Sequence, residues 1–206
     1  MAGSGVAWRG RLGTRLRRGA AAVGLGAAAV VGAASCHGPT TESVATIDVH
    51  CLATYFLYPN PPTTGEFDST IQVAVSTPTW TNARDEKVKV TFNGVNLSPD
   101  MVPSITSTPF SFSAGASLEV TGATTGSGGT AIDATLEPTD GGGEDGSAPL
   151  VANVTSELTV PDAAPGKVTV RFSNLGWTFT HLSLYQTLSC SPKDGTDPTV
   201  ASFPIR

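Results

Sequence analysis

Apolar and polar residues alternate with a period of two along most of the chain after residue 43. The alternation is clear in residues 44–49, 71–75 and 88–92, where Val, Ile and Phe alternate with polar or small residues. A period of two is typical of strands that bury one face. Six further runs show the same pattern: residues 117–121, 131–136, 154–160, 168–172, 182–188 and 200–205. The sequence therefore predicts nine short strands, and no run after residue 36 has the apolar periodicity of a helix.

Turn-forming residues separate these runs. The clusters are residues 59–62 (PNPP), Asn93-Gly94, residues 140–143 (DGGG) and Pro165-Gly166. Gly, Pro, Asn and Asp favour the backbone angles that tight turns need. Many short strands joined by turns predict an antiparallel, immunoglobulin-like β-sandwich, with a small β-barrel as the alternative. We expect one domain, residues 44–206.

The first 35 residues differ from the rest and predict an export signal. Residues 1–18 hold five arginines and no acidic residue, and residues 19–34 are an uncharged run of Ala, Gly, Val and Leu. That run is too short to span a bilayer, so residues 1–35 are interpreted as a cleaved signal peptide. The Arg17-Arg18 pair suits twin-arginine export, but Gly19-Ala20 follow where a bulky apolar residue is usual, so the general secretory route stays open.

The end of this segment resembles the lipobox of bacterial lipoproteins. Residues 33–36 read Ala-Ala-Ser-Cys, in which Cys36 is the residue that would be acylated and become the new N-terminus. Lipidation would leave Cys51 and Cys190 to pair in an oxidising compartment, which accounts for the odd cysteine. Residues 36–43 would then be a short linker. Ordinary cleavage just before Cys36, with free secretion, is the alternative.

Charge narrows the range of partners. The whole chain has a net charge of −5, but the five arginines of the head are removed with it, which leaves seven Lys or Arg against seventeen Asp or Glu. Nucleic acid and anionic lipid surfaces attract basic proteins. We therefore expect no nucleic-acid partner, and contact with a membrane only through a lipid anchor.

The candidate chemistry favours a protein that is not an enzyme. A nucleophilic mechanism needs a base, and the histidines are His37, His50 and His181, scattered along the chain without a nucleophile motif. Zinc requires ligands at close spacing, which the scattered histidines do not provide. The acidic loop at residues 140–146 could hold calcium, but it lacks the register of an EF-hand, so a solvated turn is favoured. We expect no catalytic residue, metal or cofactor.

Aromatic residues are the remaining candidates for ligand binding. A glycan-binding surface needs exposed rings, and Tyr58, Trp80 and Trp177 are the candidates considered. Packing over the sheet ends is the favoured interpretation, because large aromatic residues near the corners of sandwiches usually pack there.

Several features together are similar to a family of actinobacterial secreted β-sandwich domains of unknown function. They are the export signal, an early strand that ends in Cys51, a Pro corner before residues 88–92, a Gly-rich middle, a second Pro corner at residues 161–166, and a closing Leu-Ser-Cys at Cys190 followed by residues 201–205. The resemblance covers residues 44–205. It implies a fold and an export route, and the family has no catalytic residues to transfer.

Taken together, the sequence predicts a non-catalytic exported protein of the cell envelope, lipid-tethered at Cys36, that acts as a structural or interaction module. A cell-wall glycan-binding or lipid-binding module is the alternative, and a secreted hydrolase that uses carboxylates is a third.

Overall fold

The fold was analysed in a computed structural model of the chain. The residues that the structure describes are 37–57, 59–82, 86–101, 111–125, 131–138, 148–160, 166–181 and 184–206. All of them belong to one compact unit, Ala34–Arg206.

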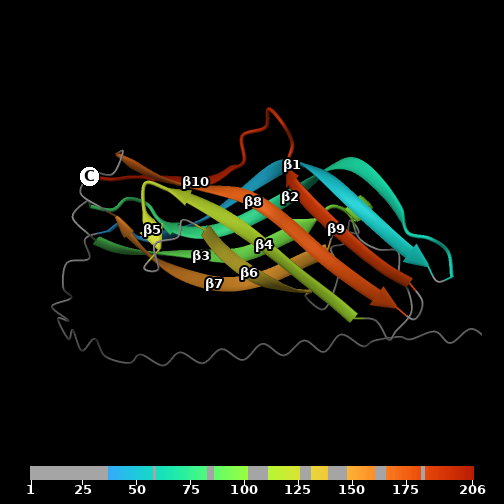
Figure 1. The fold of residues 1–206 in the computed structure, drawn as a ribbon. Coiled ribbons are helices and arrows are strands. Elements are labelled where there is room, and N and C mark those ends of the chain that lie inside the picture. The colour runs from blue at the N-terminus through green and yellow to red at the C-terminus, as the bar shows by residue number, and fades with distance from the viewer. Residues whose placement is uncertain are drawn as a thin grey trace, which may run out of the picture. The chain divides into compact units, whose positions relative to one another are not determined.

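The described residues are almost entirely β-strand (Figure 1). Seven of the nine predicted runs lie wholly in strands. Residues 182–183 of the run 182–188 lie outside the described residues, and Ile205, the last residue of the run 200–205, lies just beyond a strand. The strands are β1 (Thr40–Leu57), β2 (Thr63–Pro78), β3 (Glu86–Leu97), β4 (Ser111–Thr121), β5 (Thr124–Thr125), β6 (Ala131–Pro138), β7 (Ala148–Val160), β8 (Lys167–His181), β9 (Leu184–Pro192) and β10 (Thr199–Pro204). A single 3₁₀ turn, η1 (Pro99–Met101), is the one helical element in the described residues. The all-β prediction is confirmed.

The strands form one antiparallel sheet that closes on itself. Neighbouring strands follow the order β10-β8-β4-β6-β7-β3-β2-β1-β9, and β9 also pairs with β8. The second edge of β8 is shared: Lys167–Arg171 pair with β10, and Leu175–His181 pair with β9. Eight strands therefore form a closed barrel, with β10 as an extra strand. The structure has the predicted barrel alternative and not the favoured sandwich, because the β8–β9 pairing joins what would be two edges.

Several strands contain irregular pairing that the sequence did not predict. The register shifts between Phe92 and Gly94 in β3, and between Ser117 and Leu118 in β4. Asn153, opposite the first shift, has a φ of 49°, a left-handed conformation that Asn tolerates better than most residues. Asn93-Gly94 was predicted as a turn and instead lies inside β3, where Asn93 is an extra residue relative to β2 and forms a β-bulge.

The inward side chains form a single apolar core. The largest fully buried residues include Phe92, Phe172 and Phe203, one each from β3, β8 and β10. In β1 the burial pattern alternates strictly from Ile47 to Ala53, as the period of two requires. The alternation seen in the sequence therefore separates the inside of the barrel from the outside.

A disulfide bond ties two neighbouring strands of the barrel wall. Cys51 in β1 and Cys190 in β9 are directly opposite in the register, with their Cα atoms 4.1 Å apart, and both side chains are buried. The predicted pairing of these two cysteines is confirmed. The bond is between residues 139 positions apart in the sequence.

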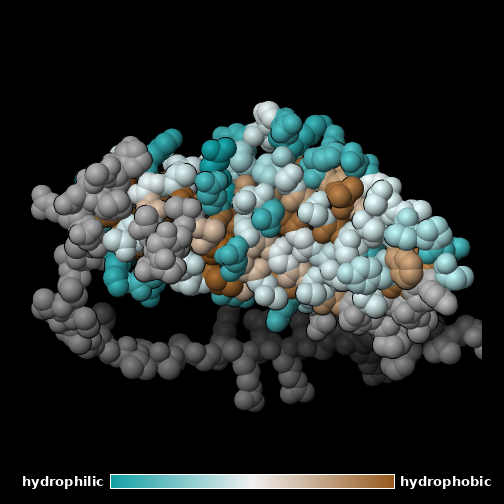
Figure 2. All heavy atoms as spheres, in the orientation of Figure 1, coloured by the Kyte–Doolittle hydropathy of each residue, from teal (hydrophilic) through white to brown (hydrophobic). Residues whose placement is uncertain are grey.

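The outside of the barrel is mostly polar. The face in Figure 2 is largely hydrophilic or neutral, with apolar side chains in small patches. The exposed large apolar residues in the described part of the chain are Val44, Leu52, Tyr55, Leu57 and Tyr185. Across the described ranges, the structure contains no helix with the length and hydrophobicity needed to cross a membrane.

Candidate functional site

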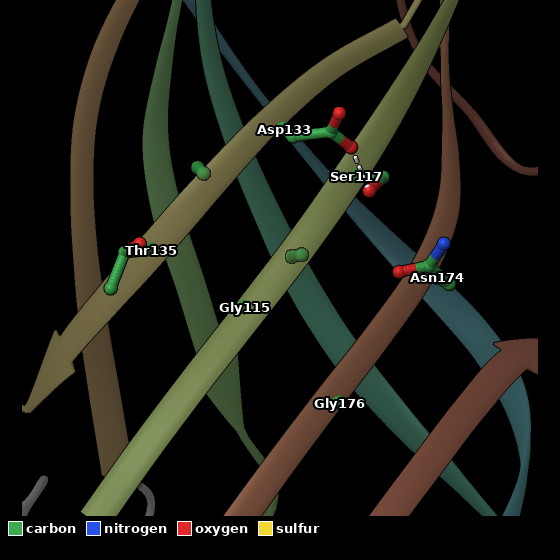
Figure 3. A pocket seen from close by; sticks show the side chains of 8 residues that line it. Gly115, Ser117, Asp133, Thr135, Asn174 and Gly176 are labelled. Atoms are coloured by element: carbon green, nitrogen blue, oxygen red, sulfur yellow. Dashed lines mark hydrogen bonds between the residues drawn. The ribbon is translucent and has the colours of Figure 1, made fainter.

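A shallow hollow lies on the outer face of the barrel, across β6, β4 and β8 (Figure 3). We call it the glycine hollow. Its volume is about 420 Å³, and it is lined by Gly115, Ala116, Ser117, Asp133, Ala134, Thr135, Asn174 and Gly176. Small-molecule sites in proteins usually enclose about 300–1,000 Å³. The hollow is therefore large enough for one or two sugar rings.

Two facing glycines make this hollow. Gly115 in β4 is directly opposite Gly176 in β8. A Cβ added at Gly115 would lie 3.4 Å from the carbonyl oxygen of Ala134, and one at Gly176 would lie 3.6 Å from that of Leu188, both ordinary contacts. A side chain would fit the backbone at either position. Glycine inside a strand weakens it and often marks a close approach by another molecule.

Polar groups line one side of the hollow. The Ser117 hydroxyl donates a hydrogen bond to Oδ1 of Asp133 on the neighbouring strand. Asn174 comes from β8, where the bulge next to Ser117 sets it opposite that residue in the register. Figure 3 shows these three side chains grouped beside the two glycines. A carboxylate accepts several hydrogen bonds and an amide both donates and accepts, so this group suits a ligand rich in hydroxyls.

A second, smaller hollow lies over β1, β2, β3 and β7. Its volume is about 250 Å³, and it is lined by Val44, Gln72, Ala74, Asn93, Gly94, Val95, Asn96, Pro149 and Leu150. Val44 is 61% exposed. The buried Oδ1 of Asn96 has no hydrogen-bond partner among the described groups. This hollow offers an apolar surface with few polar groups, and its volume is below the usual range for ligand sites.

An ionic network lies on another part of the outer face, next to the disulfide. Nδ1 of His50 lies 2.9 Å from Oδ1 of Asp68, and Nζ of Lys193 donates to Oδ2 of the same carboxylate at 2.6 Å. The hydrogen bonds from Lys193 and His50 lower the pKa of Asp68, and the bond to Asp68 raises the pKa of Lys193. All three side chains are about half exposed. The network links β1, β2 and the chain after β9, which is a structural role.

The three histidines lie at separate places in the fold. The ring of His50 is directed at carboxylates on β2, Asp68 and Glu66, and not at a serine or thiol. His37 lies 3.3 Å from Glu86 near the other end of the barrel, and His181 is the last residue of β8. The scattered positions seen in the sequence remain scattered in the fold. The structure contains no group of three or more metal-ligating side chains within its described ranges, and the acidic loop at residues 140–146 lies outside them.

The aromatic candidates have different environments. Trp177 is 3% exposed inside the barrel and packs near Phe112, with 6.1 Å between ring centroids, so it is not available as a platform. Trp80 is partly exposed beyond the end of β2, with the guanidinium of Arg206 5.2 Å from its ring centre. Tyr58 and Cys36 lie outside the described residues.

Sequence reasoning missed the residues of the glycine hollow. The predicted strand began at Ser117, after Gly115, and the segment from Asn174 to Gly176 was not assigned to a strand. One signal was present: glycines in Ser-Ala-Gly-Ala-Ser and Asn-Leu-Gly-Trp are each flanked by residues that alternate as a strand does. That the two glycines face each other depends on the register of β4 and β8, which alternation alone does not give.

Comparisons of the chain with protein-family models, with curated proteins and with solved structures found no match.

Proposed function

We propose that this protein is a non-catalytic, exported component of the cell envelope, tethered through Cys36, whose barrel is a rigid interaction module. The observation that carries the proposal is the buried disulfide between Cys51 and Cys190. Disulfides persist in oxidising compartments outside the cytosol. The signal-like head and the lipobox-like residues 33–36 agree with that location.

The tether is tested by phase partitioning. Wild-type protein from the native envelope should enter the detergent phase, because acyl chains on Cys36 bring apolar surface that the folded barrel lacks. The variant Cys36→Ser should remain in the aqueous phase. Aqueous partitioning of both proteins would refute the tether and leave free secretion.

A second candidate function is recognition of a cell-wall glycan at the glycine hollow. The half-buried backbone at Gly115 and Gly176 forms a floor without side chains, and Asp133 and Asn174 offer an acceptor and an amide beside it. Sugars present an apolar ring face and a rim of hydroxyls, which this combination matches. Lipid binding inside the fold has less support, because the inward side chains are packed into one core and are almost wholly buried.

A pull-down on purified cell wall tests the glycan proposal. We expect the wild type to be retained and Gly176→Val to lose at least tenfold in retention, because the new side chain fills the hollow. Gly65→Val is the matched control: Gly65 is on the exposed surface of β2, and an added Cβ meets nothing within 4 Å. Both variants should fold, as thermal melting would show. Equal retention of both variants would exclude the glycine hollow.

A hydrolase would show a different result. Turnover on a panel of glycans, lost on Asp133→Asn, would indicate that the carboxylate acts on a ligand and does not only bind it. Glycoside hydrolysis generally requires two carboxyl groups across the scissile bond. Asp133 is the single acidic residue that lines the hollow in the described part of the chain, so we expect no turnover.

A further inference from the structure

The described chain is paired with the barrel from its first residue, His37. His37 forms a β-bridge with Thr81, and the amide of Gly38 donates to the carbonyl oxygen of Trp80 at 2.8 Å. The amide of Thr79 donates in turn to Pro39. Gly38 is two residues from Cys36, a path of about 7 Å at most. Any group attached to Cys36 is therefore held close to this end of the barrel.

The same end presents an aromatic ring and a cation. The Trp80 indole packs directly on Gly38, where an added Cβ would lie 2.6 Å from the ring. The guanidinium of Arg206 lies over the ring of Trp80, 5.2 Å from its centre. The amide of Arg206 donates to Thr81, which fixes the C-terminal segment here. Trp is enriched where proteins meet the headgroup layer, and Arg extends its charge into that layer.

A polar network holds this end rigid. The Oε2 atom of Glu86 accepts hydrogen bonds from the Thr81 hydroxyl at 2.9 Å and from the Asn82 amide at 2.7 Å. His37 lies 3.3 Å from the other oxygen of the same carboxylate. We call residues 37–39, 79–82 and 204–206 the tether end. Its ring and cation are thus held in place on the barrel.

Charges are divided unevenly along the barrel. Five of the six Lys and Arg residues in the described chain lie toward the tether end, in β3, in the first residues of β8 and after β10: Lys87, Lys89, Lys167, Arg171 and Arg206. The acidic side chains toward this end are Glu42, Glu86, Glu119, Glu157 and Asp197. Among the described side chains, those farther from it are Asp48, Glu66, Asp68, Asp133, Glu137 and Asp194, and Lys193 is the one Lys or Arg of the described residues in that part. An anionic surface would repel the distant part and not the tether end.

We propose that the tether end rests on the surface of the bilayer that anchors Cys36, with Trp80 and Arg206 in the headgroup layer and the glycine hollow held away from it along the barrel wall. This docking rests on the proposed tether. Charge orients the protein, and the acyl chains supply the affinity. The occupant of this surface is a bilayer with anionic headgroups, and a partner protein at this end is the alternative that the test can detect.

Tryptophan quenching tests the docking independently of the cell's own acylation. The chain from Cys36 onward contains the complete described barrel and its disulfide, and Cys36 is its one thiol outside that bond. Coupling Cys36 to a maleimide lipid places the protein on vesicles of phosphatidylcholine and phosphatidylglycerol. This chain has two tryptophans, Trp80 and the buried Trp177. A lipid with a nitroxide near its headgroup should quench the emission of Trp80.

Two variants complete the experiment. Trp80→Phe reports the background from Trp177, and a long flexible Gly/Ser spacer between Cys36 and His37 releases the barrel without changing its folded part. We expect quenching several-fold above the Trp80→Phe background in the wild type and near background with the spacer. Wild-type quenching at background, with the protein still coupled, would overturn the docking and leave this end free for a partner protein.

Failure of the tether would look different. Mass spectrometry of the protein from the native envelope would then show an unmodified or absent Cys36. Quenching in the chemically coupled protein would still report whether the tether end contacts the bilayer.

Discussion

At the scale of single residues, glycine has two separate roles in this barrel. Gly115 and Gly176 lie where a side chain would fit, so their absence of side chains creates the outer hollow. Gly122, directly after β4, has a φ of 85°, and an added Cβ would clash with the carbonyl oxygen of Lys167. There the backbone itself requires glycine, because other residues rarely adopt a positive φ.

A series of three Gly→Ala variants separates strain from steric clash. Gly122→Ala introduces both backbone strain and a steric clash. Gly166→Ala, at a φ of 83°, introduces backbone strain alone, because nothing lies within 4 Å of the added Cβ, and Gly65→Ala introduces neither. We expect the free energy of unfolding to fall by about 2 kcal/mol or more for Gly122→Ala and by about 1 kcal/mol for Gly166→Ala. Gly65→Ala should change it by less than about 0.5 kcal/mol. Urea denaturation measures all three, and similar losses for Gly122 and Gly166 would exclude the clash.

At the scale of elements, the sequence predicted the position of each long strand but not its length. Alternation is visible in the middle of a strand, where the inner face is fully apolar, as at residues 88–92. It fades at strand ends and at bulges, where Asn, Gly and Thr resemble turn residues. For that reason Asn93-Gly94 was predicted as a turn and the segment from Asn174 to Gly176 was not assigned to a strand, although both lie inside strands. The glycine hollow depends on the second of these segments, so the alternation of the sequence did not predict it.

The disulfide between β1 and β9 is an element-scale feature whose contribution can be measured. Cys51→Ala/Cys190→Ala removes the bond and leaves the register of the two strands to their hydrogen bonds. A bond across 139 residues restricts the unfolded chain strongly, so we expect a loss of about 4 kcal/mol in the free energy of unfolding. Urea denaturation of the double variant and of the oxidised wild type gives the difference. A loss in the free energy of unfolding below about 1 kcal/mol would show that the disulfide contributes little here by restricting the unfolded chain.

At the scale of the whole molecule, a barrel and a sandwich give the same sequence pattern. Both bury one face of every strand, so the alternation predicts the core of either fold. The two folds differ in whether β9 pairs with one neighbouring strand or with two. The number of neighbours depends on how strongly the sheet twists and coils before its first and last strands meet. The sequence supports the cysteine pairing that links β9 to β1, but it contains no comparable signal for the pairing of β9 with β8.

Hydrogen exchange distinguishes the two architectures directly. In the barrel, β9 is hydrogen-bonded to β1 on one side and to β8 on the other. β10 is paired with β8 on one side, and on its other side the chain forms only an isolated bridge, between Thr81 and Ile205 just after the strand, among the described residues. Consecutive amides of β9 between Leu184 and Cys190, where both neighbours pair with it, should therefore all exchange slowly, at rates set by global unfolding. Amides of β10 that do not point at β8 should exchange faster. If alternate amides of β9 exchanged as fast as those of β10, β9 would be an edge strand and the barrel would be open, because an edge leaves every second amide to solvent.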